Sequence, residues 1–188
     1  MDELINIKWH GRGGQGAITA AKIVAKAAFH EGFKGVTMAP SFGTERRGAP
    51  VSTSLKLART KIYDLSPIKA PEIVVVLDHA LLDEVDVTQG LAPGGLIVLN
   101  TPKSPEDYGF KNVRLACADV TELGAQAGLK KGIVNSGIIG SFVKASGLIK
   151  DTDYLLELIR DEFKAVKPDA NARAAELAFN ATIMKVLP

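Results

Sequence analysis

Six residues near the N-terminus combine glycines with polar side chains in a pattern that suits phosphate binding. They read Gly11-Arg12-Gly13-Gly14-Gln15-Gly16 and fit G-x-G-x-x-G, between a predicted strand and a predicted helix. Glycines permit a tight turn and the close approach of a ligand, while the N–H groups at a helix start carry partial positive charge. We therefore expect contact with a phosphate or with a neighbouring subunit. The alternative is a turn that only lets the strand and the helix pack closely.

A dinucleotide site makes a second demand, which this sequence does not meet. Such a site places an Asp or Glu at the end of the following strand, where it binds the ribose hydroxyls. That strand ends here at Thr37-Met38-Ala39-Pro40, and the first acidic residue after it is Glu45, inside a loop. The arginine that would bind a 2′-phosphate is also missing from that place. The pattern therefore disfavours a nicotinamide cofactor.

The predicted loop between Pro40 and Pro50 is the second candidate site. It contains Glu45, Arg46 and Arg47 among glycines and a proline. Arginine suits bidentate binding of anions and buried ion pairs at interfaces, although a surface loop also carries solvated charge. The concentration of these residue types favours a binding or interface role.

The remaining reactive side chains do not form a recognisable site. His10, His30 and His79 lack the spacing of metal ligands. Asp78 follows a predicted buried strand and is explained equally well as a helix cap. The single cysteine, Cys117, excludes an internal disulfide and any zinc or iron–sulfur site built from cysteines of this chain alone. It is predicted to be a buried apolar residue, and no catalytic residue is predicted.

Composition narrows the class of protein. The 188 residues are 46% hydrophobic and 23% charged, which indicates a single domain over residues 1–188. Lys and Arg exceed Asp and Glu by 23 to 21, a net charge of +2 that argues against a nucleic-acid partner. The longest aliphatic run, Ile73 to Leu77, is far shorter than the ~20 residues of a membrane span. We expect a cytoplasmic protein with no membrane contact.

The order of the predicted elements indicates an α/β fold. Its mainly parallel sheet is flanked by helices and has a Rossmann-like glycine turn after the first strand. Continuous apolar runs predict strands buried on both faces, and alternating runs predict half-exposed ones. The predicted strands are 4–9, 35–38, 51–57, 72–77, 95–99 and 113–116. The predicted helices are 18–29, 81–87, 136–145, 151–163 (with Asp151 as N-cap) and 171–184.

Four of these segments resemble the gamma subunit of pyruvate:ferredoxin oxidoreductase and its 2-oxoacid relatives. The resemblance covers about residues 5–186, nearly the whole chain. It is carried by Trp9-His10-Gly11-Arg12-Gly13-Gly14-Gln15-Gly16 with Thr19-Ala20-Ala21, by Phe42-Gly43-Thr44-Glu45-Arg46-Arg47-Gly48-Ala49-Pro50, by Pro71-Glu72-Ile73-Val74-Val75-Val76-Leu77-Asp78, and by Val134-Asn135-Ser136-Gly137-Ile138-Ile139-Gly140.

The resemblance implies one part of a larger enzyme of anaerobic metabolism. In that family, thiamine diphosphate lies between the alpha and beta subunits. Iron–sulfur clusters belong to beta and to a ferredoxin-like delta subunit, and Mg is also held by partner subunits. The complex decarboxylates a 2-oxoacid, passes electrons singly to ferredoxin and transfers the acyl group to coenzyme A. This chain is then expected to hold no cofactor alone and to act only with alpha, beta and delta. The form of its glycine motif favours pyruvate as the substrate.

The resemblance also implies roles for ten residues. The glycine turn, with Gly11, Gly13, Gly14 and Gly16, accepts a phosphate-bearing group of coenzyme A or packs against a neighbouring subunit. Arginines pair with phosphates or with carboxylates across an interface, and Asn135 caps a helix or reaches the same pocket. The expected binding residues are Gly11, Arg12, Gly13, Gly14, Gln15, Gly16, Glu45, Arg46, Arg47 and Asn135. A free-standing nucleotide-binding oxidoreductase and an anion-binding scaffold protein are the alternatives.

Overall fold

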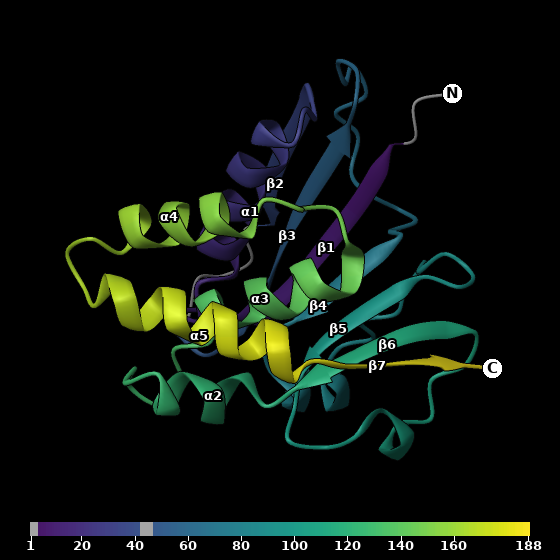
Figure 1. The fold of residues 1–188 in the computed structure, drawn as a ribbon. Coiled ribbons are helices and arrows are strands. Elements are labelled where there is room, and N and C mark those ends of the chain that lie inside the picture. The colour runs from purple at the N-terminus through teal and green to yellow at the C-terminus, as the bar shows by residue number, and fades with distance from the viewer. Residues whose placement is uncertain (1–3, 42–46) are drawn as a thin grey trace.

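A computed structural model describes residues 4–41 and 47–188, and its strands form one seven-stranded sheet (Figure 1). Their order across the sheet is β2-β3-β1-β4-β5-β6-β7. The strands are β1 (Ile5–Arg12), β2 (Gly35–Ser41), β3 (Pro50–Ala58), β4 (Ile73–Val76), β5 (Leu96–Asn100), β6 (Val113–Ala118) and β7 (Ile183–Leu187).

The sheet has a parallel centre and antiparallel margins. Strands β1, β4, β5 and β6 are parallel neighbours, whereas β3 is antiparallel to both β1 and β2, and β7 is antiparallel to β6. Strands β1, β2, β4, β5 and β6 therefore run in one direction, which confirms the mainly parallel sheet. In a dinucleotide-binding fold the strand after the first helix lies beside the first strand. Here β3 occupies that position and separates β1 from β2.

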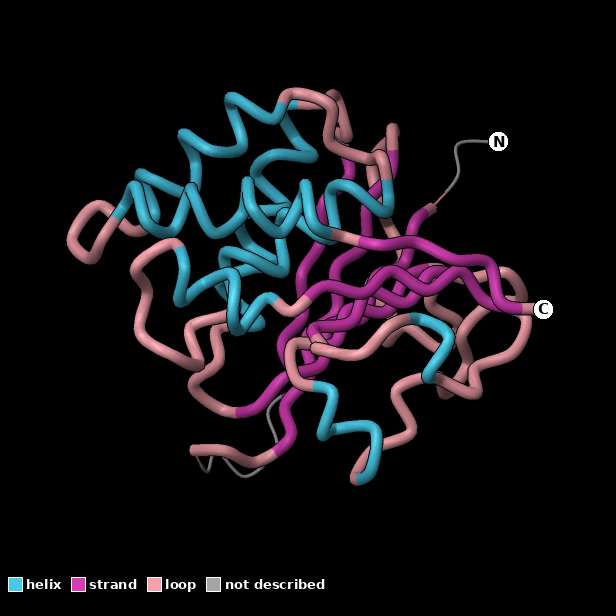
Figure 2. The backbone as a smooth tube through the Cα atoms, turned by 60° about the horizontal axis from the view of Figure 1, so that its bottom comes forward, coloured by secondary structure: helices cyan, strands magenta, loops and turns pink. Residues whose placement is uncertain are grey.

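The five α-helices lie on one face of the sheet (Figure 2). They are α1 (Ala17–His30), α2 (Val120–Gln126), α3 (Asn135–Ser146), α4 (Thr152–Glu162) and α5 (Pro168–Ala181). The other face is covered, over β4–β7, by the short 3-10 helices η1 (His79–Asp83) and η2 (Pro105–Asp107) and by neighbouring loops. None of the described helices is long and apolar enough to cross a membrane.

The central strands bury side chains in two separate cores because successive residues point to opposite faces. In β4, Val75 joins the core under the helices, whereas Val74 and Val76 join the core on the second face. All three side chains are fully buried. This double burial explains the continuous apolar run by which the sequence predicts this strand.

A close crossing of α3 and α5 holds the helical layer together. A Cβ added at Gly140 of α3 would lie 1.9 Å from the carbonyl oxygen of Ala175 in α5. One turn earlier, the Ser136 hydroxyl donates a 2.7 Å hydrogen bond to Oδ1 of Asn171, and both residues are buried. Glycine at position 140 therefore sets the distance between the two helices.

The predicted boundaries differ from the structure mainly at the C-terminus. The prediction of helix through Met184 is wrong: α5 begins earlier, at Pro168, ends at Ala181, and is followed by β7. Thr182 has extended backbone angles, and the segment after it contains Ile183 and Val186, residue types that favour strands. The predicted helix at 81–87 is only partly correct, because the 3-10 helix η1 covers residues 79–83, and α2 was not predicted.

The sequence predicts Asp151 as a helix cap and Pro40 as the end of a strand, and only the first prediction is confirmed. Asp151 caps α4 as predicted, because its Oδ1 accepts a 3.0 Å hydrogen bond from the N–H of Tyr154. Pro40, by contrast, does not close β2, which continues to Ser41. Proline is tolerated there because β2 is an edge strand of the sheet.

The α3–α5 crossing generates the first prediction. Gly140→Ala places a methyl group where a backbone carbonyl already lies, and overpacking of this kind costs about 1–3 kcal/mol. We expect the free energy of unfolding in urea to fall by that amount. Gly109→Ala is the control, because no atom lies within 4 Å of a Cβ added there. Equal stability of the two variants would contradict this account of the crossing.

Candidate functional site

The candidate site lies at the C-terminal ends of β1 and β4, where the chain connections diverge. From β1 the chain passes through α1 toward β2 on one side, and from β4 it passes through η1 to β5 on the other. Ligands of open α/β sheets bind at such switch points. The glycine motif begins within the last two residues of β1, Gly11 and Arg12, and Asp78 lies two residues after the end of β4.

The glycine turn is closed by the side chain of Gln15. Its Oε1 accepts a 2.7 Å hydrogen bond from the N–H of Arg12, and the Gln15 N–H donates to the Arg12 carbonyl at 2.9 Å. Gly14 and Gly16 have φ of +92° and +80°, a left-handed conformation that L-residues with a Cβ rarely adopt. The Gln15 side chain also ties the turn to the end of β4, because its Nε2 donates a 3.4 Å hydrogen bond to Oδ2 of Asp78.

The end of the predicted loop between Pro40 and Pro50, called the arginine loop below, packs on the glycine turn. Gly13 donates to the carbonyl of Ala49 at 2.9 Å and accepts from the N–H of Gly48 at 3.1 Å. A Cβ at Gly14 would lie 3.9 Å from Cγ of Arg47. The structure therefore brings the two sequence motifs together at Arg47, whereas Glu45 and Arg46 lie outside the described residues.

Two helix N-termini converge at Gly16. This residue precedes α1, and a Cβ added to it would lie 2.7 Å from Nδ2 of Asn135, the first residue of α3. Asn135 is 9% exposed, and its Oδ1 accepts a 3.0 Å hydrogen bond from the N–H of Ser136. The amide group Nδ2, a hydrogen-bond donor, therefore lies against the turn that opens α1.

These two helix starts carry no carboxylate. Neither α1 nor α3 has an acidic residue in its first turn or a side-chain cap. In contrast, Asp119 caps the start of α2, Asp151 caps the start of α4, and α5 has Asp169 in its first turn. The first turns of these two helices thus place no carboxylate of their own on the positive ends of the helix dipoles, which favours a bound anion.

Arg12 is held by carboxylates of its own chain. Its Nε donates to Oδ2 of Asp78 at 2.8 Å, and its Nη2 donates to Oε1 of Glu84 at 2.5 Å. Its Nη1 donates to the carbonyl oxygen of Gly48 at 3.2 Å. These three contacts engage all three nitrogens of the guanidinium, and the hydrogen bonds to Glu84 and Asp78 raise its pKa. Arg12 therefore joins β1, the end of β4, η1 and the arginine loop.

Asp78 is charged at neutral pH although it is only 22% exposed. Partial burial acts to raise the pKa of Asp78, but hydrogen bonds from Arg12 and from the N–H of Ala80 outweigh it, so the pKa lies below its usual value. The bond from Ala80 also confirms Asp78 as the cap of η1. The hydrogen bond from Arg12 likewise lowers the pKa of Glu84.

The pairing of Arg12 with Asp78 and Glu84 is not predicted from the sequence. There, Asp78 is either a site residue at the end of a buried strand or a helix cap, and Glu84 is expected on a solvated helix face. Predicting this pair requires the order of the strands. β1 and β4 are parallel neighbours with His10 opposite Val76, so residues 12 and 78 lie opposite each other two positions later. No pattern in the sequence states which strands are neighbours.

The histidines and the cysteine do not add catalytic chemistry to this site. His10 is 6% exposed, and burial, with the charge of Lys8, lowers its pKa to about 4. His30 contacts Asp151 at 3.0 Å at the far end of α1. Burial raises the pKa of Cys117 to about 12, so its thiol is protonated at neutral pH. No group of three potential metal ligands occurs in the described part of the chain.

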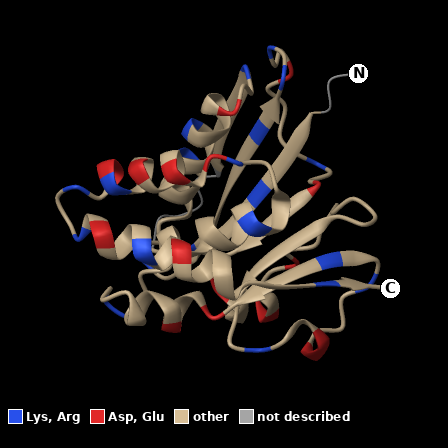
Figure 3. Ribbon diagram, viewed as in Figure 1, with Lys and Arg blue, Asp and Glu red and all other residues tan. Residues whose placement is uncertain are grey.

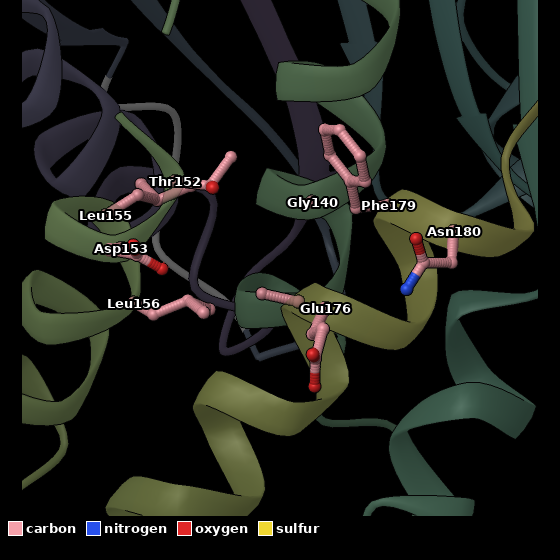
Figure 4. A pocket seen from close by; sticks show the side chains of 9 residues that line it. Gly140, Thr152, Asp153, Leu155, Leu156, Glu176, Phe179 and Asn180 are labelled. Carbon is pink, nitrogen blue, oxygen red and sulfur yellow. The ribbon is translucent and has the colours of Figure 1, made fainter. Parts of the chain in front are cut away.

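A hollow lies away from the glycine turn, between α4 and α5, and Gly140 of α3 also lines it (Figure 4). Its volume is about 250 Å³, and the carboxylates of Asp153 and Glu176 line it beside Asn180. Two carboxylates repel an anion, and the hollow contains none of the residues predicted from the sequence. It is therefore not the site of the glycine turn.

Comparison with known proteins identifies close relatives. The family model described as pyruvate ferredoxin/flavodoxin oxidoreductase matches residues 6–181. The "pyruvate/ketoisovalerate oxidoreductases common subunit gamma" of Thermococcus kodakarensis is 45% identical over 185 residues, which cover 96% of this chain and 98% of that protein. The "pyruvate synthase subunit PorC" of Methanocaldococcus jannaschii is 40% identical over 182 residues, covering 97% of this chain and 99% of that one.

Solved structures share the fold over the whole chain. The pyruvate oxidoreductase subunit PORC of Thermotoga maritima superposes with a TM-score of 0.79 at 30% identity, covering 97% of this chain and 99% of that one. The 2-oxoglutarate:ferredoxin oxidoreductase of Magnetococcus marinus, solved with 2-oxoglutarate, coenzyme A and succinyl-CoA, superposes at 0.74 with 17% identity. All of this chain corresponds to 33% of that longer chain, a likeness of fold alone.

The Arg12 pairs generate a pH-dependent prediction. Asp78 has a lowered pKa, so its pairing stabilises the fold above the unfolded value near 3.9 and loses effect as pH falls through the folded value. We expect Arg12→Met to lower the free energy of unfolding by about 1–2 kcal/mol at pH 7 and by much less near pH 3.

The control for this prediction is Arg160→Met, which removes an exposed pair with Asp169. Exposed pairs contribute about 0–1 kcal/mol, so this change is expected to be small at both pH values. Urea unfolding of each variant at the two pH values measures the difference. A loss for Arg12→Met that is as large at pH 3 as at pH 7 would refute the pairing.

His10 generates a further prediction. The unfolded imidazole titrates near 6.5, whereas the folded one titrates near 4, so the unfolded state binds protons first as the solution is acidified. His10 therefore costs stability progressively from about pH 6.5 down to 4. In NMR spectra of the folded chain its ring should remain neutral at pH 5.5, while in urea it should titrate near 6.5. A folded ring that titrates near 6.5 would show that His10 is not desolvated.

Proposed function

The chain belongs to the pyruvate ferredoxin/flavodoxin oxidoreductase family as a gamma-type subunit, and we propose that it supplies the phosphate-binding part of a coenzyme A pocket. The observation that carries the proposal is the meeting of the two helix N-termini at Gly16, with no acidic residue in the first turn of either helix. Coenzyme A carries several phosphates, and two dipole ends with unpaired N–H groups suit such a ligand.

The donors at this point fit a phosphate chemically. The Nδ2 group of Asn135 lies against Gly16 and adds side-chain donors to the backbone N–H groups of the first turns of α1 and α3. Glycine at position 16 has no Cβ, so the backbone can approach an anion closely. Arg47 is exposed beside Gly14 and adds a cation at the rim.

Arg12 has a positioning role in this proposal. Its guanidinium is engaged by Asp78, Glu84 and Gly48 rather than turned toward a ligand. It fixes the start of the glycine turn and also neutralises two carboxylates that would otherwise repel an anion. The roles of Glu45 and Arg46 stay predictions.

The substrate and partners follow from the family and from the relatives' names. The complex is a multi-subunit oxidoreductase, and we propose that alpha, beta and delta subunits complete it, with ferredoxin as the electron acceptor. Thiamine diphosphate, Mg and the iron–sulfur clusters would lie in those partners. We propose pyruvate as the 2-oxoacid, although the Thermococcus relative is named for both pyruvate and ketoisovalerate. The cytoplasmic location stays a prediction.

A free-standing nucleotide-dependent oxidoreductase is disfavoured by the strand order. The position beside β1 where a ribose-binding strand end would lie belongs to β3, which runs antiparallel to β1. An anion-binding scaffold protein would use the same helix N-termini, but the family match over residues 6–181 favours the enzyme subunit.

Asn135→Asp tests the pocket in the assembled complex. The change keeps the shape of the side chain and places a negative charge where the helix ends meet. We expect the KM for coenzyme A to rise at least 10-fold with little change in kcat at saturation, because the lost interaction serves binding. A carboxylate at a helix N-terminus is stabilising by about 0.3–1 kcal/mol, so the Tm should not fall.

The matched control is Asn180→Asp, which makes the same charge change at an exposed residue of α5. Its KM for coenzyme A should equal that of the wild type. If Asn135→Asp also leaves this KM unchanged, the glycine turn does not bind coenzyme A, and its contact is with another subunit or with its own helix alone.

A further inference from the structure

An apolar groove runs along the outer side of α1. Residues of α1, β2 and α4 line it, and its volume is about 410 Å³. Five of the eight lining side chains are apolar: Ala25 and Phe29 of α1, Val36 and Met38 of β2, and Leu158 of α4. The other three are Lys22, Lys26 and Tyr154.

The apolar residues beside this groove are unusually exposed. Phe29 is 66% exposed and Met38 37%, and Ile18, two to three turns nearer the start of α1, is 42% exposed. Residues 18, 22, 25 and 29 follow helical spacing, so they form one stripe on α1. A continuous apolar patch with a polar rim is typical of a surface that contacts another protein.

The charge at the rim of the groove is positive. Lys22 and Lys26 both contact the same carboxylate, that of Glu162, at 3.2 and 3.4 Å. Figure 3 shows basic residues (blue) on α1 and acidic residues (red) on the neighbouring helix α4. His30 and Asp151 form a separate pair at the end of α1, and Tyr154 stacks on His30. Two ammonium groups thus share one carboxylate, which leaves an unmatched positive charge for a partner's acid.

The edge strand beside the groove is protected against the addition of another strand. Pro40 lies within β2, and proline on an edge strand discourages pairing with a further strand. A partner at this surface therefore docks through side chains. Phe29 and Met38 supply an apolar anchor point, and the lysines supply a charged rim, the arrangement common at protein interfaces.

We propose that the groove between α1, β2 and α4 docks another subunit of the same complex, which inserts an apolar side chain flanked by carboxylates. The inference rests on the proposed function, because it takes the partner from the multi-subunit family. It also adds to that function. The stripe on α1 reaches Ile18, one residue after the first helical residue Ala17, so a subunit that covers the stripe also lies beside the proposed anion pocket.

The apolar part is tested in the complete, co-purified complex by the concentration at which this chain dissociates. Phe29→Asp introduces a charge into the groove, and we expect the dissociation constant, measured by mass photometry on dilution, to rise at least 100-fold. Phe29→Ala should raise it about 10-fold. Tyr63→Ala is the control, because Tyr63 is 82% exposed and lies outside the groove, and it should cause no change.

The charged part is tested by two substitutions with opposite expected signs. Lys26→Glu should raise the dissociation constant about 10-fold at low salt. Glu162→Gln should lower it a few-fold, because both lysines become available to the partner. The two effects should shrink at high salt, where exposed charges are screened. A merely structural role for the Lys26–Glu162 contact would make both variants weaker or neutral.

Failure of this inference is distinguishable from failure of the proposed function. An unchanged dissociation constant for Phe29→Asp, with the Tm of the complex also unchanged, overturns the docking site while leaving the coenzyme A test with Asn135→Asp untouched. A Glu162→Gln complex that dissociates more readily overturns the charged rim. Self-association of the free chain that Phe29→Asp abolishes, with normal binding to the other subunits, overturns the proposal in favour of a second copy.

Discussion

One guanidinium organises the C-terminal edge of the sheet. Arg12 ends β1 and contacts Asp78 after β4, Glu84 after η1, and the carbonyl of Gly48 in the arginine loop. Asp78 and Glu84 flank η1, whereas Arg12 and Gly48 are distant from them in the sequence, and the connections after β1 and β4 leave in opposite directions across the sheet. Without a cation at this point, two carboxylates would face each other at the end of a parallel strand. The glycine turn contains two residues with positive φ, Gly14 and Gly16, and the segments around it are held in place by their contacts with Arg12.

The same ion pairs separate negative from positive charge across the site. Side chains alternate along β1, so Arg12 shares a face with His10, whereas Gly11 contacts Ala17 on the face that carries α1 and α3. The carboxylates are therefore collected on the side of η1. The two uncapped helix starts lie on the other side, with Gly16 and Asn135 between them. An anion that approaches the helix starts meets dipole ends and amide donors, because Arg12 has already neutralised the acids nearby.

Local patterns in the sequence were sufficient to predict the fold class, the glycine turn and the arginine loop. They were not sufficient to predict how the two motifs contact each other. Double burial of β4 leaves a continuous aliphatic run, and the glycines with positive φ leave G-x-G-x-x-G, so both were predictable. The insertion of β3 between β1 and β2 leaves no local trace, and with it the pairing of Arg12 and Asp78 escaped prediction. The predicted helix runs on into the first two residues of β7, Ile183 and Met184, because no glycine or proline marks the end of α5, and β7 itself was not predicted. The contact of Gly16 with Asn135 depends on the packing of α3, which only the tertiary structure supplies.

The burial of the single thiol has a practical consequence for work in air. Cys117 is 3% exposed on β6, and its pKa of about 12 leaves almost no thiolate at neutral pH. Peroxide and disulfide reagents attack the thiolate, so this chain offers them very little to react with. Because its thiol is unreactive, this subunit is suited to carry a tag or label in experiments performed in air.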